Sequence, residues 1–392
     1  MAAIGRKVFD KISYHLKNGH NVKFVRNVSN PGTFKYSDLE ITTTTNPQEK
    51  PTPEKLLFGH HFTDHMLHVE WSINKGWGKP HIGPLQNISL HPAAKVLHYG
   101  AELFEGMKAY KGIDEKIRLF RPMENMKRMN KTAERCALPT FDGTELVKCI
   151  KKLLSVDADW VPTTQNSSLY IRPTLIGNDP TLGVSLSHNA MLFVILGPVG
   201  SYFTTGLDPI TLFADPKYVR AWPGGCGSYK MGSNYAPTVQ VQAKAVEANC
   251  HQVLWLFGDD HQLTEVGTMN IFMYWTNEQG EDELITHPLD GLVLPGITRS
   301  SLIKVAEKWG EFKVTEKPYT MKQVIKALKE NRIKEIFGAG TACVVCPVKE
   351  ILYKGELLNI PAVGEPKLSM RFYDELTDIQ LGKKESEWTE LI

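Results

Sequence analysis

Two long β-rich runs, residues 168–177 and 190–197, place the strongest constraint on the fold of this 392-residue chain. Both runs are bounded by Asn, Pro and Gly, which is typical of strands. The loop between them, residues 177–183 (GNDPTLG), consists of residues that form turns. This pattern predicts a sheet whose strands are mostly antiparallel.

Amphipathic segments on both sides of these runs predict helices. In the segment 142–156, Leu146, Ile150, Leu153 and Leu154 share one helical face, and Asp142 or Thr144 is the predicted N-cap. A turn-rich stretch at 197–209 separates the strands from a second set of elements. The chain is therefore predicted to have two domains of mixed α/β (α+β) class. The other predicted helices are 121–138, 237–248, 297–309 and 321–330, and the other predicted strands are 210–214, 253–257, 268–275 and 335–337, the last running into a turn at 338–341.

Length and composition exclude several classes of protein. A chain with 42% hydrophobic and 22% charged residues is an ordinary globular one and not a disordered or fibrous one. Its longest apolar run, about 190–199, is shorter than the roughly 20 residues that a membrane helix needs. A net charge of +2 argues against general nucleic-acid binding. Six cysteines are too few for a disulfide scaffold, so we expect a reducing compartment.

The first 36 residues carry seven basic residues against one acid, a net charge of +6. The rest of the chain carries 38 basic and 42 acidic residues, a net charge of −4. A basic, acid-poor, loosely amphipathic start is typical of an organelle transit peptide, and an unstructured tail is the alternative. We therefore predict a leader (1–36), a linker (37–55), a small α/β domain (56–203), an interdomain linker (204–217) and a large domain (218–392).

A lysine follows a glycine cluster in the segment 224–230 (GGCGSYK). A phosphate-binding P-loop is excluded by the spacing, because Met231 follows Lys230 where that motif needs Ser or Thr. Glycines let a planar cofactor approach the backbone closely, and a lysine there can form a Schiff base with an aldehyde cofactor. The alternative is a surface lysine in a flexible loop.

Two further segments support the cofactor interpretation. Glu265, next to a glycine in 263–272 (LTEVGTMNIF), is a carboxylate that can face the ring nitrogen of pyridoxal phosphate. The segment 291–299 (GLVLPGITR) is predicted to end a strand and open a helix, whose first N–H groups suit a phosphate. A capped turn and an ordinary helix start are the respective alternatives.

These segments, with FTDHM at 62–66, LFEGMK at 103–108, RLFRP at 118–122 and YIRP at 170–173, resemble the fold-type IV pyridoxal-phosphate enzymes. The resemblance is to the animal branched-chain amino acid aminotransferases, the mitochondrial form in particular, and runs from about residue 57 to 388. It implies a small N-terminal open α/β domain and a larger C-terminal pseudo-barrel domain. It also implies a homodimer in the mitochondrial matrix, with the cytoplasm as the alternative.

The resemblance assigns roles to residues that hold the cofactor, pyridoxal 5′-phosphate. Lys230 is implied to form the Schiff base and to move a proton between the substrate Cα and the cofactor C4′. Glu265 is implied to pair with the pyridine nitrogen and Tyr235 to bond the phenolic oxygen. The phosphate is implied to bind Arg128, the N–H groups of Ile297 and Thr298, and the Thr341 hydroxyl, whereas Arg220 is expected near the phosphate or between the domains.

The resemblance also implies a substrate pocket. It must accept the apolar side chains of Leu, Ile and Val and also the γ-carboxylate of glutamate. Arg172, which shares a strand face with Tyr170, or a tyrosine beside it, is expected to receive that carboxylate. Each aromatic residue taken singly also fits plain core packing. The implied substrate-binding residues are Phe58, Tyr99, Phe104, Tyr170, Arg172, Leu182, Val184, Tyr202, Thr268 and Ala342.

Cysteines and histidines occur in two patterns that bear on redox and metal sites. The spacing of Cys343 and Cys346 allows a disulfide, and we expect a lowered pKa for one thiol near an electropositive site. The resemblance implies a redox switch at this pair, and the alternative is two buried thiols. No second CxxC is present in the sequence, so a cysteine zinc site is not predicted. The histidines at 60, 61, 65 and 68 are interpreted as incidental, because no HExxH motif accompanies them.

The sequence thus predicts a ping-pong transaminase that uses a branched-chain amino acid and 2-oxoglutarate. Within the same fold, the alternatives are a D-amino acid aminotransferase and a lyase that eliminates. Outside it, the alternatives are a phosphate- or nucleotide-binding regulatory protein and a scaffold protein.

Overall fold

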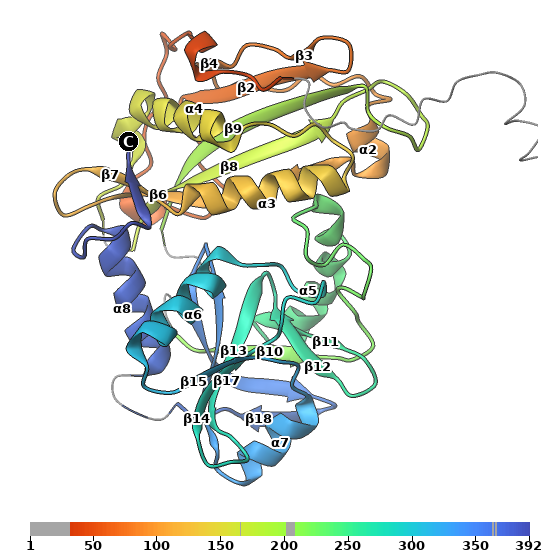
Figure 1. Cartoon of the computed structure of the whole chain (residues 1–392), viewed down its shortest axis with the longest axis vertical. Coiled ribbons are helices and arrows are strands. Elements are labelled where there is room, and N and C mark those ends of the chain that lie inside the picture. The colour runs from red at the N-terminus through yellow and green to blue at the C-terminus, as the bar shows by residue number, and fades with distance from the viewer. Residues whose placement is uncertain (1–31, 165, 201–207, 363, 365–366) are drawn as a thin grey trace, which may run out of the picture.

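The computed structural model describes residues 32–164, 166–200, 208–362, 364 and 367–392. Two domains lie one above the other in Figure 1, each built around its own sheet. The first and last described segments both belong to the upper, small domain. The fold is mixed α/β, as predicted.

The small domain contains a ten-stranded sheet in the order β1-β4-β2-β9-β8-β6-β7-β19, with β3 paired to β2 and β5 to β8. All of its pairings are antiparallel except that of β1 with β4. Its strands are β1 (Glu40–Ile41), β2 (His65–Ser72), β3 (Gly76–Trp77), β4 (His81–Pro84), β5 (Glu102–Phe104), β6 (Met107–Lys111), β7 (Ile117–Phe120), β8 (Ser168–Gly177), β9 (Asn189–Val199) and β19 (Thr389–Leu391).

Two helices, α3 (Pro122–Arg135) and α4 (Gly143–Val156), cover one face of this sheet in Figure 1. Every second residue of β9 from Ala190 to Leu196 is buried, which is the period-two pattern of a strand with one covered face. The Asp142 side chain accepts a hydrogen bond from Thr144 N and so caps α4, as predicted. The short helix α2 (Lys95–Tyr99) lies near the end of β8.

In the large domain, six strands form a closed ring in the order β12-β11-β10-β17-β16-β13, because β13 pairs back with β12. β14 and β15 extend the sheet beyond β13, and β18 pairs with β17. The ring matches the predicted pseudo-barrel. The strands are β10 (Ile210–Ala214), β11 (Gln252–Phe257), β12 (Gln262–Val266), β13 (Met269–Thr276), β14 (Asp282–Thr286), β15 (Lys313–Glu316), β16 (Ile333–Gly340), β17 (Val344–Tyr353) and β18 (Glu356–Asn359).

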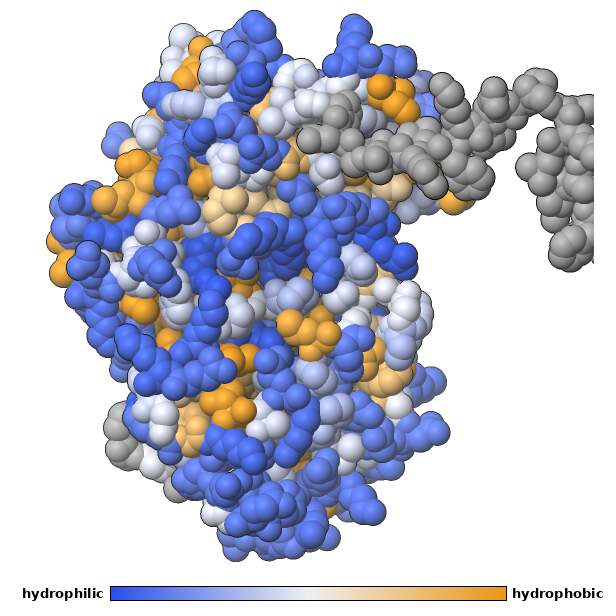
Figure 2. All heavy atoms as spheres, viewed as in Figure 1, coloured by the Kyte–Doolittle hydropathy of each residue, from blue (hydrophilic) through white to orange (hydrophobic). Residues whose placement is uncertain are grey.

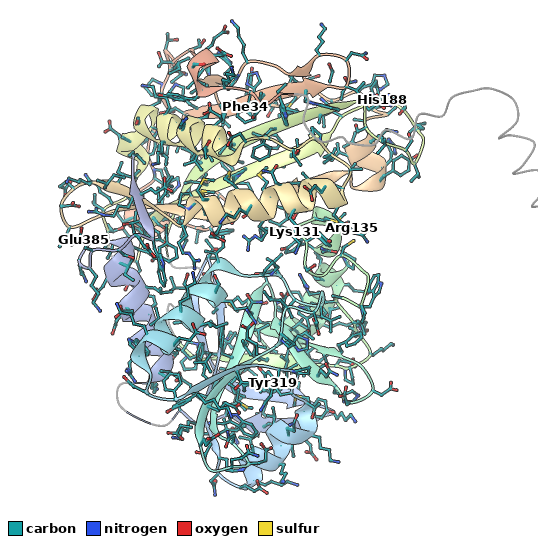
Figure 3. All side chains as sticks on the ribbon, viewed as in Figure 1. Phe34, Lys131, Arg135, His188, Tyr319 and Glu385 are labelled. Carbon is teal, nitrogen blue, oxygen red and sulfur yellow. The ribbon has the colours of Figure 1, made fainter. Side chains whose placement is uncertain are left out.

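Four helices pack around the ring: α5 (Thr238–Glu247), α6 (Ile297–Trp309), α7 (Met321–Lys329) and α8 (Leu368–Gln380). Thr320 and Gln323 form a capping box that fixes the start of α7. Beneath it, Tyr319 is fully buried and is labelled in Figure 3. The apolar sides of α7 and of the ring strands form one core, and those of α6 and α8 form another with Phe272 and Phe337.

Folded structure begins before the predicted end of the linker at residue 55. Phe34, labelled in Figure 3, is 3% exposed and packs against Trp77 and Phe141. Tyr36 N donates to Glu145 Oε2 at 2.6 Å, and β1 pairs with β4. Only residues 1–31 of the predicted leader lie outside the described residues. The expectation that folding starts near residue 56 is wrong, because an apolar side chain and backbone pairing fix this segment earlier.

Other predicted boundaries also need correction. The predicted interdomain linker 204–217 contains β10, which lies between β11 and β17 in the ring. The large domain does not extend to residue 392, since β19 pairs with β7 of the small domain. The turn predicted at 338–341 begins later, because β16 continues to Gly340 in register with β17. No strand immediately precedes α6, where 291–296 is irregular.

Figure 2 shows the two domains as two lobes with hydrophobic residues scattered among hydrophilic ones on the face that is visible. None of the described helices is long and apolar enough to cross a membrane.

Candidate active site

A cavity of about 480 Å³ lies between the two domains. Its walls come from β5, β8 and α3 of the small domain and from the lysine turn, β13, β16 and the start of α6 of the large domain. The predicted site residues that line it are Phe58, Phe104, Arg128, Tyr170, Arg172, Lys230, Tyr235, Thr268, Ile297, Thr298, Thr341 and Ala342.

The glycine cluster forms a tight turn that presents Lys230. Gly224 has φ of +80°, and a Cβ at Gly227 would lie 2.5 Å from Ala221 Cβ, so both positions require glycine. Asn234 Nδ2 donates to the carbonyls of Cys226 and Tyr229 at 2.7 and 2.9 Å and so holds the turn together. The turn is therefore ordered by its own contacts and is not a flexible loop.

The Lys230 side chain reaches into the cavity between two aromatic rings. Its Nζ lies 3.2 Å from Tyr235 Oη and 4.6 Å from the centre of the Phe104 ring. The backbone N–H of Lys230 donates to Thr132 Oγ1, and its carbonyl accepts from Phe104 N at 3.1 Å. Both neighbours belong to the small domain, so the lysine is fixed at the junction of the domains.

Glu265 is 2% exposed and lies behind the cavity wall, at the end of β12. Its Oε2 pairs with Arg220 Nε at 3.0 Å, and its Oε1 accepts from Leu294 N at 2.7 Å. Burial raises the pKa of Glu265 above the ordinary value of a glutamate, although Arg220, the Leu294 N–H and Lys230 oppose the shift. Arg220 thus contacts Glu265, which corrects its expected place at the phosphate or between the domains.

Arg128 projects from α3 and meets a buried carboxylate that sequence reasoning did not include in the site. Its Nε and Nη2 donate to the two oxygens of Glu105 at 2.7 and 2.8 Å, and its Nη1 donates to Pro295 O. Asn125 Nδ2 also donates to Glu105, at 2.8 Å. Burial alone would raise the pKa of Glu105, but the Arg128 guanidinium, Lys230 and Asn125 hold it below its ordinary value. Three of the five guanidinium N–H groups are thereby used.

The start of α6 forms another wall of the cavity, where Ile297 and Thr298 lie. The first N–H groups of a helix have no partner inside the helix, so they are free to bind an anion. The Thr341 residue lines the same end of the cavity. Arg128, through Pro295 O, is attached to the segment that leads into α6. The predicted phosphate residues therefore surround one end of the cavity.

Arg172 stands among aromatic rings at the other side. Its guanidinium carbon lies 4.7 Å from the centre of the Phe104 ring and 5.2 Å from that of Tyr170, and its Nη2 donates to Tyr170 Oη at 3.1 Å. Phe58 packs edge-on against Tyr170. Among the described residues, the buried Nε of Arg172 has no hydrogen-bond acceptor. A guanidinium that lines a cavity beside an apolar wall is suited to a carboxylate on an otherwise apolar ligand.

Several predicted substrate residues are not brought into this cavity by the fold of one chain. Leu182 is 69% exposed, Val184 is 88% exposed and Tyr99 is 41% exposed. All three lie around α2 and the loop between β8 and β9. Tyr202 lies outside the described residues.

Other side chains in or near the cavity were not predicted. Glu102, Thr174 and Asn270 line it, and burial raises the pKa of Glu102. Lys108 is buried and its Nζ donates to Ala342 O at 2.6 Å, while burial lowers its pKa to about 8. The available signal was the segment 103–108, which contains Glu105 and Lys108, but no spacing rule distinguishes its charges from surface ones.

Cys343 and Cys346 follow the turn that carries Ala342. Both thiols are free, and Cys343 Sγ lies 3.1 Å from Met269 Sδ. Burial raises the pKa of Cys343 to about 12 and also raises that of Cys346. The expectation of a lowered thiol pKa is therefore wrong, because the loss of hydration outweighs the attraction of the Lys108 ammonium.

The histidines near β2 have ordinary partners. His65 Nδ1 bonds Asp157 Oδ1 at 2.6 Å and its Nε2 accepts from Thr44 N, while the rings of His68 and His81 pack edge to face. The described residues contain no group of three or more His, Cys, Asp or Glu that could hold a metal ion.

Comparison with known proteins gives a consistent result. Residues 102–351 match the family described as amino-transferase class IV. The mouse cytosolic branched-chain-amino-acid aminotransferase is 58% identical over 91% of this chain and 93% of its own length. The bovine mitochondrial branched-chain-amino-acid aminotransferase is 56% identical over 91% of each chain. A crystal structure of the branched-chain amino acid aminotransferase from Thermobaculum terrenum in its PLP form has a similar fold, with a TM-score of 0.67, 14% identity and coverage of 85% of this chain and 99% of that one.

Proposed function

This chain belongs to the class IV aminotransferases, and from that premise we propose that it is a branched-chain-amino-acid transaminase. It transfers the amino group of L-leucine, L-isoleucine or L-valine to 2-oxoglutarate, which gives the branched-chain 2-oxo acid and L-glutamate. The observation that carries the proposal is the cavity that joins Lys230 to an apolar wall bearing the Arg172 guanidinium.

The residues of the cavity fit pyridoxal 5′-phosphate as its cofactor. Lys230 Nζ is placed to bind an aldehyde carbon, and the adjacent Tyr235 Oη is placed to form a hydrogen bond with a phenolic oxygen. The buried Glu265 supplies a carboxylate for a ring nitrogen, and Arg128 with the start of α6 supplies positive charge for a phosphate. When bound, the cofactor stabilises negative charge on the substrate Cα.

The chain itself contributes orientation and proton transfer. Lys230 is the group that would take a proton from the substrate Cα and deliver it to the C4′ atom of the cofactor. Its backbone bonds to Thr132 and Phe104 limit the positions that Nζ can reach. Arg220 favours the ionised form of Glu265, because a guanidinium at 3.0 Å opposes the rise in pKa that burial causes.

The substrate wall explains how one cavity accepts two kinds of side chain. Phe58, Phe104 and Tyr170 offer apolar surface to leucine, isoleucine and valine. For glutamate, the Arg172 guanidinium and the Tyr170 hydroxyl are donors for the distal carboxylate. Charge-assisted hydrogen bonds of this kind are roughly twice as strong as neutral ones. The backbone of the turn at Thr341 and Ala342 faces the same cavity and is placed to bind the α-carboxylate.

We propose that the functional unit is a homodimer. Support comes from Leu182, Val184 and Tyr99, which the resemblance places at the substrate but which are exposed on the single chain. A second copy that places these side chains over the cavity would complete the apolar wall. Sedimentation of the purified protein at assay concentration should give twice the monomer mass of 44.1 kDa. A monomeric, fully active protein would contradict the proposal.

We also propose that the protein acts in the mitochondrial matrix. The support is the basic leader and the occurrence of mitochondrial as well as cytosolic relatives. Since Phe34 is part of the small-domain core, processing must stop before that residue. Import of the full chain into isolated mitochondria, followed by N-terminal sequencing, should locate the cut before Thr33. Exclusion from mitochondria would favour the cytoplasm.

Initial rates and absorbance together test the function. The wild type should be yellow, should change its spectrum on addition of L-leucine, and should form glutamate from 2-oxoglutarate. Lys230→Ala should lose turnover and should no longer be bleached by borohydride. Turnover of L-leucine by Lys230→Ala would contradict the assignment. D-Alanine as the preferred donor, or elimination without glutamate formation, would favour the two alternatives within the fold.

A further inference from the structure

A fully buried lysine supports the loop on which the exposed Leu182 and Val184 lie. Lys95, the first residue of α2, is 1% exposed. Its Nζ donates to Gly183 O at 2.6 Å and to Ser185 Oγ at 3.1 Å, and lies 3.9 Å from Asp179 Oδ2. The loop above it, residues 181–186, is exposed at every position.

The charge of Lys95 makes these contacts specific. An ammonium group has three donors, and burying it without acceptors carries a large cost in hydration. Gly183 O and Ser185 Oγ accept hydrogen bonds from two of these donors, and the Asp179 carboxylate at 3.9 Å balances the charge. The loop therefore cannot shift without leaving a buried charge unsatisfied, and its conformation is fixed by the lysine beneath it.

The two hydrogen bonds of Lys95 are made to the residues on either side of Val184. Gly183 and Ser185 flank Val184, and Gly183 follows Leu182, so both apolar side chains are held outward while the backbone between them is tied inward. The base of the loop is closed separately, because Asp179 N donates to Ser187 Oγ and Ala94 bridges to Pro180. In Figure 3 the label of His188 marks the C-terminal side of this loop.

Helix α2 connects this anchor to a further predicted substrate residue. Lys95 opens the helix and Tyr99 ends it, and Leu97 between them is 58% exposed. The loop and the helix thus form one exposed apolar surface on a rigid support. Rigid presentation of apolar side chains is what a pocket needs in order to discriminate between substrates.

We propose that Lys95 is a positioning residue for the transamination reaction. It fixes the loop 181–186 so that Leu182 and Val184 enclose the substrate side chain in the cavity of a second copy. The inference rests on the proposed function and on the proposed homodimer. Lys95 contacts neither substrate nor cofactor, so its effect is on substrate affinity and not on the chemical step.

The first test compares Lys95→Met with the wild type and with Lys79→Met, a control at an exposed lysine paired with Glu40. We expect the KM for L-leucine to rise about tenfold in Lys95→Met, since loss of apolar contacts in a pocket costs roughly 10- to 200-fold. The kcat should stay within about twofold. Amide hydrogen exchange of residues 182–186 should accelerate in Lys95→Met and not in Lys79→Met. An unchanged KM and unchanged exchange would overturn the proposal.

A second test uses mixed dimers and remains valid if Lys95→Met is less stable. In a dimer of one Lys95→Met subunit and one Lys230→Ala subunit, the one working cavity is covered by an intact loop from its partner, so the KM should be that of the wild type. In a dimer of one wild-type subunit and one subunit carrying both changes, the working cavity is covered by the altered loop, so the KM should be raised. The reverse pattern, or no difference between the two dimers, would overturn the proposal.

Failure of the proposed function is recognised independently of these comparisons. It would appear as an absence of leucine turnover by the wild-type protein itself, and it would overturn this inference as well. Leucine turnover by the wild type with equal KM values in both mixed dimers would overturn the inference alone.

Discussion

The backbone N–H of Lys230 donates a hydrogen bond to the hydroxyl of Thr132 at 3.2 Å. The lysine belongs to the large domain and the threonine to α3 of the small domain. One helical turn earlier on α3 is Arg128, whose carbonyl accepts a hydrogen bond from the same hydroxyl. The lysine and the arginine of the site are therefore connected through a single buried side chain.

Thr132→Val should test this connection. Valine keeps the shape but removes the acceptor, so the Lys230 N–H is left unsatisfied, which costs about 1–3 kcal/mol. We expect the free energy of unfolding to fall by about that amount in urea denaturation, and kcat/KM for L-leucine to fall by roughly tenfold or more. Thr132→Ser, which retains the hydroxyl, is the control and should lose much less activity. Equal activity of the valine and serine variants would contradict the role.

Glu105→Gln should lower the free energy of unfolding, because it leaves the buried Arg128 without its carboxylate partner. Removing one partner of a buried ion pair typically costs about 3–5 kcal/mol, because the other charge stays buried. Lower stability and weaker cofactor retention on dialysis are expected. The matched control is Glu311→Gln, which breaks a similar bidentate pair with Arg371 on the surface and should change little. A stability equal to that of the control would show that Glu105 does not carry this charge.

The same pair predicts a pH dependence. The folded-state pKa of Glu105 lies below its ordinary value, so its ionised form contributes stability that is fully present above the unfolded pKa of roughly 4.3. That contribution is lost as the pH falls through the folded pKa. We expect the difference in unfolding free energy between the wild type and Glu105→Gln to be constant above about pH 5.5 and to shrink at lower pH. Urea titrations from pH 7 to pH 3 measure it.

Arg172→Met should separate the two half-reactions. The apolar substrates do not need the guanidinium, whereas the distal carboxylate of 2-oxoglutarate loses a charge-assisted bond worth about 1.5–3 kcal/mol. The KM for 2-oxoglutarate should therefore rise roughly tenfold to hundredfold while that for L-leucine changes little. Arg118→Met, at a pair with Asp114 outside the cavity, is the control. A larger effect on leucine than on 2-oxoglutarate would contradict the assignment.

Cys343 and Cys346 remain a predicted redox pair, and the structure fixes how slowly they should react. With a pKa of about 12, Cys343 is mostly protonated at neutral pH, and only the thiolate reacts with peroxide. The rate of inactivation should therefore increase about tenfold for each unit of pH between 7 and 9. Thiol treatment should restore activity, and Cys343→Ser should resist inactivation. A parent-like response of Cys343→Ser would rule out the switch.

Sequence periodicity and turn residues predicted the helices and strands whose bounds depend on neighbouring residues in the chain. The strand 168–177, the strand 210–214 and the helix 297–309 have the expected bounds, since their periodicity and flanking turn residues determine them. Pairing between distant segments was not accessible in this way. The union of β19 with β7 and the ion pair of Glu105 with Arg128 depend on contacts formed only when the chain folds. Most of the predicted cavity residues came from resemblance to a family rather than from periodicity.

The exposure of Leu182, Val184 and Tyr99 on the single chain could not be predicted from local sequence patterns either. Residue types and spacing carry no information about which copy of a chain a side chain serves. A pattern that marks these residues for the substrate is thus compatible with a fold that leaves them outside their own cavity.

The pairing of β19 with β7 determines the order in which the two domains are completed. The chain enters the large domain after β9 and returns to the small domain after α8, so the large domain is an insertion within the small one. The strand that ends the small-domain sheet is therefore synthesised after every element of the large domain. Until then the edge of β7 that β19 covers stays without that partner, so the sheet of the first domain is finished only once the second domain has been made.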